Sequence, residues 1–144
     1  MNSKNIFSSG TSTSGVDYSM LLLRFVAGSA MLYGHGLGKL QKLISGAKIE
    51  FVDFLGLGAE LTFILVVISE FLCAALIFLG LFTRIAAIPL IINMAYIVFV
   101  YHGADEFKSR ELPLIYLAIF IVILLIGPGK HSFDRLILKR NKTV

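Results

Sequence analysis

Residues 61–82 read LTFILVVISEFLCAALIFLGLF, an apolar run in which Glu70 is the only charged side chain. A helix that crosses the hydrocarbon core of a bilayer needs about 20 predominantly apolar residues. A soluble core helix needs only one apolar stripe, so an unbroken run favours lipid on the remaining faces. The run therefore predicts a transmembrane helix, and it decides the fold class.

Three further apolar runs, at 18–37, 85–101 and 112–127, have the same character. The last two are short for a hydrocarbon core of about 30 Å, and we expect flanking Tyr, His and Arg side chains to complete them at the interface. Pro113 falls in the first turn of the last run, where a missing N–H costs little. The sequence thus predicts an all-α integral membrane protein, a bundle of four transmembrane helices.

The composition agrees with this class and argues against others. Hydrophobic residues make up 57% of the chain and charged residues 15%, whereas soluble domains average about 45–50% and about 25%. The basic residues behind the net charge of +4 lie at the ends of the runs, which favours membrane lipids as partners over nucleic acid. The single cysteine, Cys73, cannot form an internal disulfide, a C-x-x-C pair or a cysteine-based zinc site, and we interpret it as a small buried apolar residue.

The remaining segments are predicted to lie outside the bilayer core. Residues 1–15 are rich in Ser, Thr, Asn and Gly, which favours a disordered tail before a membrane domain at 16–129. Residues 46–55 mix apolar and charged side chains, which predicts a short interfacial helix or a re-entrant piece between the first two spans. Residues 130–144 read as a basic amphipathic tail.

Four spans place both chain ends on one side of the membrane. Seven Lys and Arg residues lie on that side and five on the other. Because positive residues concentrate in the cytoplasm, this excess predicts that both termini are cytoplasmic.

Three polar residues lie inside apolar runs and are the buried candidates, namely Arg24, Glu70 and Asn93. A charge at the bilayer centre costs at least about 2.5–3.5 kcal/mol, so such groups face the bundle interior and pair. With the first two spans aligned end to end, Arg24 and Glu70 differ in depth by about 7 Å at 1.5 Å per residue. We therefore expect an Arg24–Glu70 ion pair, completed by the Asn93 amide. The pair either fixes helix packing or handles a proton or ligand.

A second group lies where the spans meet the side opposite to the termini, namely His35, Glu60, His102, Glu111 and Tyr116. Helical spacing also puts His35 on one inward stripe with Arg24, Gly28 and Met31. The group forms either a cavity mouth with proton-active side chains or an ordinary interfacial belt. Its His and Glu residues come from separate segments without ligand spacing, so no metal is expected.

Three stretches resemble the DoxX family in order and spacing, namely LLLRFVAGSAMLYGHGLGKL at 21–40, SEFLCAALIFLGLFTRIAA at 69–87, and ELPLIYLAIFIVILLIGPGKHSFD at 111–134. The resemblance covers about residues 18–135. The residues that match motif positions of the family are Arg24, His35-Gly36, Lys39-Leu40, Glu70, Gly80 to Arg84, Glu111, Gly127 to Gly129 and Asp134. Gly34 departs from the pattern, since a bulkier residue is expected there, and this departure predicts a wider cavity end.

The resemblance implies a four-helix protein of the bacterial inner membrane, in a family similar to small membrane subunits of thiosulfate:quinone oxidoreductase. The expected function is a membrane subunit or accessory protein of a quinone-linked redox system, in which His35, Glu70 or Glu111 moves protons beside a quinone. The chain carries no haem, flavin or metal motif, so electrons would arrive from another protein subunit. Whether the chain is itself an enzyme stays open.

Two alternatives remain beside this function, because family membership does not fix an activity. The first is a non-catalytic factor that assembles or stabilises another envelope protein, with buried polar groups that only hold the bundle together. A transporter is the weaker alternative, because four helices are few and no pair of half-helices marks a substrate site.

Overall fold

The computed structural model describes residues 12–53 and 56–140, and this part of the chain contains helices and connecting segments but no strand. The α-helices are α1 (Thr13–Met31), α2 (Leu37–Ile44), α3 (Ala59–Val67), α4 (Ala74–Leu79), α5 (Thr83–Tyr96), α6 (Phe107–Ile126) and α7 (Phe133–Arg140). Three π-helical turns interrupt them, η2 (Leu32–Gly36), η3 (Ile68–Cys73) and η4 (Ile97–Tyr101). Each π-helical turn continues the helix before it.

Within the described residues, four continuous helices are long and apolar enough to cross a membrane, namely Thr13–Ile44, Ala59–Leu79, Thr83–Tyr101 and Phe107–Ile126. The predicted fold class, an all-α four-helix membrane bundle, is confirmed. The first helix extends beyond the predicted span 18–37 at both ends. The fourth helix begins at Phe107, before the predicted run at 112–127, so Pro113 lies inside α6 rather than in its first turn.

The predicted interfacial helix between the first two spans is wrong for the described residues, because 45–53 form no helix. Gly46 has a φ of +67°, a left-handed conformation that favours glycine and ends α2. The Asp53 carboxylate then accepts hydrogen bonds from the N–H groups of Leu57 at 3.0 Å and Gly58 at 2.9 Å. These bonds favour a loop, and the placement of the loop at the interface stays a prediction.

The start of the first helix differs from the prediction of a disordered tail at 1–15. Residues 1–11 lie outside the described part. The Ser12 hydroxyl accepts a hydrogen bond from the Gly15 N–H at 3.3 Å and so caps α1. The helix begins at Thr13 because this cap satisfies one of its free N–H groups.

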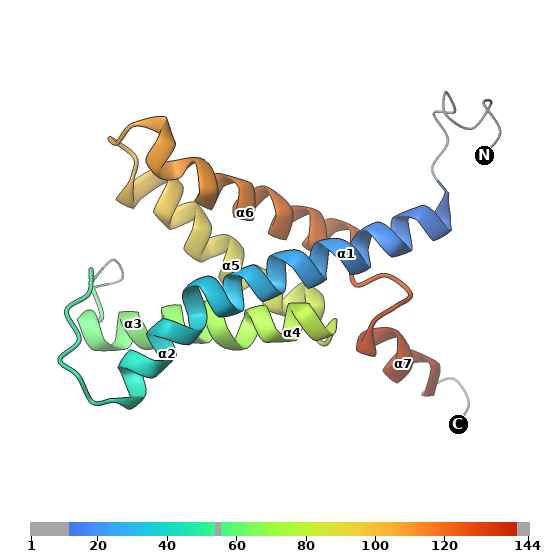
Figure 1. The fold of residues 1–144 in the computed structure, drawn as a ribbon, viewed down its shortest axis with the longest axis horizontal. Helices are drawn as coiled ribbons and strands as arrows, with labels where there is room; N and C mark the ends of the chain where they lie inside the picture. Colours follow the sequence, from blue (N-terminus) through green and yellow to red (C-terminus); the bar gives the residue numbers. More distant parts are fainter. Residues whose placement is uncertain (1–11, 54–55, 141–144) are drawn as a thin grey trace.

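The four long helices associate as two pairs, α1 with α4 and α5 with α6 (Figure 1). A Cβ on Gly28 would lie 2.9 Å from the Phe78 nitrogen, so this glycine allows the backbones of α1 and α4 to approach closely. Side chains with almost no exposed surface fill the core between the pairs, namely Ala74, Ile77, Ala87, Leu90, Phe120 and Ile123. Towards the end that carries α2 and α3 the two pairs diverge (Figure 1).

The segment after α6 is fastened to the end of the bundle where α1 begins. Asp134 accepts hydrogen bonds from the Phe82 N–H at 2.7 Å and the Thr83 N–H at 3.0 Å, and from the Thr83 hydroxyl at 2.8 Å. Lys130 forms an ion pair with Asp17 at 3.0 Å. Because Asp134 caps the start of α5, the first turn of α7 is held at the end of a membrane-spanning helix.

Candidate functional site

Arg24 lies at the terminal end of the bundle and does not pair with Glu70, so the predicted ion pair is wrong. The side chain is 1% exposed, and its Nη2 donates a hydrogen bond to the His131 carbonyl at 2.6 Å. The close contact of Gly36 with the Glu70 backbone sets the offset between the first two helices. Arg24 precedes Gly36 by roughly 18 Å of helix at 1.5 Å per residue, which exceeds the reach of its side chain.

Glu70 is buried at the opposite end, where it binds residues from two other helices. Its side chain is 3% exposed and forms an ion pair with Lys39, which comes from α2. The Asn93 amide of α5 donates a hydrogen bond to the second carboxylate oxygen at 2.9 Å, in the position expected for it. We call these three residues the Glu70 site. An ionised carboxylate in the membrane is costly to bury, and here a cation and an amide offset that cost.

A π-helical turn explains why Lys39 faces the interior and His35 does not. The α-helical stripe of Arg24, Gly28 and Met31 is buried as expected, but His35 is exposed and Gly36 is buried in its place. The wider turn η2 shifts the inward face by one residue, which also turns Lys39 towards Glu70. The sequence analysis missed Lys39 because the predicted first span ended at residue 37, whereas the helix continues to Ile44. The sequence signal that could have identified Lys39 is its match to a motif position of the DoxX family.

The other two π-helical turns also lie at this site. Glu70 belongs to η3, and η4 follows Asn93 in the third span. In π-helical turns the backbone hydrogen bonds are less favourable than in an α-helix, and such turns are frequent at functional sites. Their convergence on the Glu70 site identifies it as the strongest candidate in the described residues.

The Glu70 site opens into a cavity of about 330 Å³. Aromatic and aliphatic side chains dominate its walls, and the polar groups of the site lie among them. The lining residues are Lys39, Glu50, Phe51, Val52, Val66, Glu70, Asn93, Tyr96, Ile97, Tyr101 and His102. The arrangement fits a ligand with an apolar ring and a polar group that can exchange hydrogen bonds with Lys39 and Glu70.

The loop that contributes one wall of the cavity is anchored to α3 by two of its side chains. The Phe51 ring lies edge-to-face on Phe63, with the centroids 5.2 Å apart. The Asp53 carboxylate accepts a hydrogen bond from the Thr62 hydroxyl at 3.1 Å, beside its bonds to the backbone. Hydrogen bonds, above all from the Gly58 N–H, hold the pKa of Asp53 below its usual value. The carboxylate therefore stays ionised at neutral pH and keeps the loop beside the cavity.

The five residues predicted at the cavity mouth do not gather there. His102 lines the cavity, and its Nδ1 lies 2.7 Å from Asp105. His35 is exposed on the first helix and contacts the Tyr116 ring edge-to-face at 6.0 Å. The remaining two, Glu60 and Glu111, are exposed and do not line the cavity. A Cβ on Gly34 would meet no atom within 4 Å, so the departure from the family pattern at this position does not widen the cavity.

The sequence model of the DoxX family matches residues 19–103, more than half of the chain. The chain belongs to the DoxX family. The match includes every residue of the Glu70 site, so this site lies within the family region of this DoxX protein. It ends at Gly103, and α6 and α7 lie outside it. No curated protein and no solved structure matches the chain significantly.

Proposed function

We propose that this DoxX protein is a membrane subunit or accessory protein of a quinone-linked redox system, and that the Glu70 site binds the quinone head group. The observation that carries the proposal is the ion pair of the buried Glu70 with the partly buried Lys39, which together with Asn93 faces a cavity within the membrane-spanning bundle. A buried ion pair adds little to the stability of a fold, because the cost of desolvating the two charges offsets much of their attraction. Intramembrane ionisable residues more often mark a ligand or proton site.

The residues of the site fit both redox forms of a quinone. A cavity of about 330 Å³ holds a substituted ring, at the lower end of the roughly 300–1,000 Å³ range for small-molecule sites. Lys39 has three N–H donors, of which the Glu70 pair uses one, so it can also donate to a quinone carbonyl. The Glu70 carboxylate can accept a hydrogen bond from a quinol hydroxyl.

The chain would bind the ring and handle its protons. Oxidation of a quinol releases two protons and two electrons, and Glu70 is the carboxylate placed to accept the two protons one after the other. His102, paired with Asp105 at the rim of the same cavity, can pass each proton to water. The two electrons go to a redox centre in a partner subunit, because this sequence contains no redox-cofactor motif.

Filling the cavity is expected to abolish quinone retention. Val52 lies on the loop wall and is partly exposed, so Val52→Trp adds bulk to the cavity without disturbing the core. We expect the protein purified in mild detergent to retain quinone, and Val52→Trp to retain at least about tenfold less, measured by lipid extraction and mass spectrometry. The matched control is Val26→Trp, which adds the same bulk to an exposed position of α1.

The same experiment distinguishes the quinone proposal from the alternative function, an assembly or stabilising role. Absence of quinone from the wild-type protein, or equal retention in Val52→Trp, would refute the quinone proposal. A stable co-purifying envelope protein without quinone would then support an assembly or stabilising role.

We further propose that the protein resides in the bacterial inner membrane with both termini in the cytoplasm. The excess of seven Lys and Arg residues over five supports this orientation. A phosphatase fused after Val144 is expected to be inactive, whereas a green fluorescent protein in the same place is expected to fluoresce. An active phosphatase fusion would instead show that the C-terminus lies outside the cytoplasm, and the Glu70 site would then lie in the cytoplasmic half of the membrane.

A further inference from the structure

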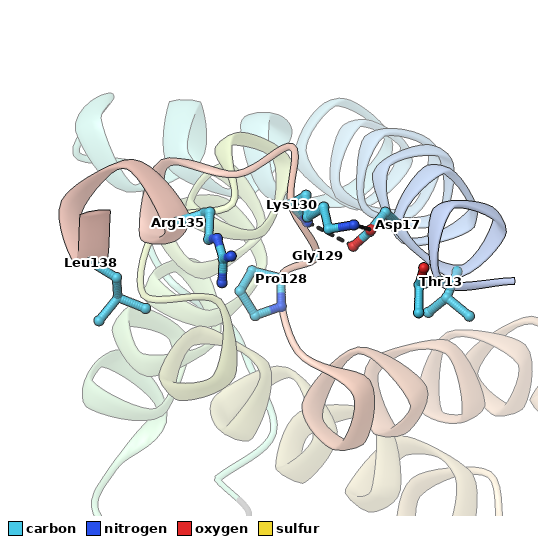
Figure 2. A pocket seen from close by; sticks show the side chains of 8 residues that line it. Thr13, Asp17, Pro128, Gly129, Lys130, Arg135 and Leu138 are labelled. Carbon is cyan, nitrogen blue, oxygen red and sulfur yellow. Dashed lines mark hydrogen bonds and ion pairs between the residues drawn. The ribbon is translucent and has the colours of Figure 1, made fainter. Parts of the chain in front are cut away.

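A hollow of about 510 Å³ lies at the terminal end of the bundle, opposite to the Glu70 site. Figure 2 shows it between the start of α1, the segment after α6, and α7. Its lining residues are Thr13, Val16, Asp17, Pro128, Gly129, Lys130, Arg135 and Leu138. The proposed quinone site uses none of them.

The charge in this hollow is positive and not fully balanced. Lys130 and Asp17 form an ion pair, so their charges offset each other. The guanidinium of Arg135 lies between α7 and Pro128 (Figure 2). Among the described residues it has no hydrogen-bond or ion-pair partner, since only its backbone N–H is bonded, to Ser132. An unpaired guanidinium beside apolar side chains favours an anionic group, above all a phosphate or carboxylate.

An apolar groove adjoins the hollow along the membrane-spanning part of the bundle. It has a volume of about 360 Å³ and lies between α1 and α6, with Val16 in the walls of both the hollow and the groove. Its lining combines small residues at the start of the first helix with larger apolar residues of α1 and α6. Its lining residues are Ser12, Gly15, Val16, Ser19, Met20, Leu23, Val122 and Ile126.

The position of α7 places the hollow at the membrane boundary. Asp134 in its first turn binds the backbone at the start of α5, which is a membrane-spanning helix. Farther along α7, Leu136, Ile137 and Leu138 are exposed and apolar. A basic amphipathic helix at this level is suited to the interface, where phosphate groups lie above acyl chains.

We propose that the hollow and the groove together bind one anionic phospholipid. The phosphate lies at Arg135, and one acyl chain lies in the groove between α1 and α6. The hollow alone would accept any small phosphate. The adjoining apolar groove favours a lipid, because a free phosphate has no apolar part that could occupy it.

The test uses the full-length protein in vesicles of phosphatidylcholine with a minor fraction of phosphatidylglycerol. After mild detergent extraction, lipid mass spectrometry measures the enrichment of phosphatidylglycerol over phosphatidylcholine in the protein fraction. We expect enrichment in the wild type and a loss of roughly tenfold in Arg135→Gln, which removes a charge-assisted hydrogen bond. Lys108→Gln removes an equally exposed charge at the other end of the bundle and should keep the enrichment.

Two further arms distinguish the lipid from a free phosphate. Ser19→Leu fills the groove and leaves Arg135 intact, and we expect it to lower the enrichment as well. An excess of inorganic phosphate should leave phosphatidylglycerol bound to the wild type. No enrichment in the wild type, full enrichment in Arg135→Gln or Ser19→Leu, or displacement by inorganic phosphate would overturn the proposal. Because the side chains of Arg135 and Ser19 are exposed, unchanged thermal unfolding should show that both variants fold.

Discussion

Replacement of Lys39 by methionine is expected to destabilise the protein by about 3–5 kcal/mol at pH 8, because it leaves the buried Glu70 carboxylate without a cation. The attraction between the two charges is then lost, whereas the cost of keeping the carboxylate out of water remains.

A double variant separates the effect of the unpaired Glu70 charge from the effect of changed side-chain packing. In Lys39→Met/Glu70→Gln the amide still accepts the hydrogen bond from Asn93, and no buried charge is left. We expect the double variant to recover most of the lost stability. Glu70→Gln alone should be milder than Glu70→Leu, which also leaves the Asn93 amide without its acceptor.

Unfolding by sodium dodecyl sulfate in mixed micelles measures these differences, with Lys108→Met as the control at an exposed lysine. Equal stability of Lys39→Met and the wild type at pH 8, or a double variant no better than Lys39→Met, would show that the ion pair is not what matters at this position.

Gly36→Leu is expected to cost about 3 kcal/mol, the second largest effect. A Cβ on Gly36 would overlap the Glu70 carbonyl oxygen and the Phe71 Cα, and both atoms belong to rigid backbone. The first two membrane-spanning helices would have to separate, and Lys39 would move away from Glu70. The substitution should therefore lower quinone retention together with stability.

The neighbouring Gly34 provides a matched control for Gly36. It belongs to the same π-helical turn, but a Cβ there meets open space. Gly34→Leu should stay within about 0.5 kcal/mol of the wild type, as surface substitutions usually do. The close approach at Gly36 would be refuted if both leucine variants unfolded at the same detergent concentration.

The sequence predicted the four spans but placed some of their ends incorrectly. Apolar runs are reliable in this respect, because the hydrocarbon core requires a minimum length of apolar helix. The polar turns at the start of α6 and the end of the first helix carry no such signal, since they lie beyond the apolar run. Their helical state depends on the helix that they continue, whereas the start of the first helix depends on its cap, Ser12.

The amino-acid sequence alone is enough to identify a four-helix membrane protein of the DoxX family and to predict that Arg24, Glu70 and Asn93 are buried, since water-free surroundings penalise bare polar groups. Which of these residues pair depends instead on how the helices pack against one another. The contact at Gly36 offsets the first two helices, and the turn η2 rotates the residues after it. Both effects arise from backbone packing between helices, and no rule of spacing along one helix contains them. They separate Arg24 from Glu70, and they bring Lys39 to Glu70 instead.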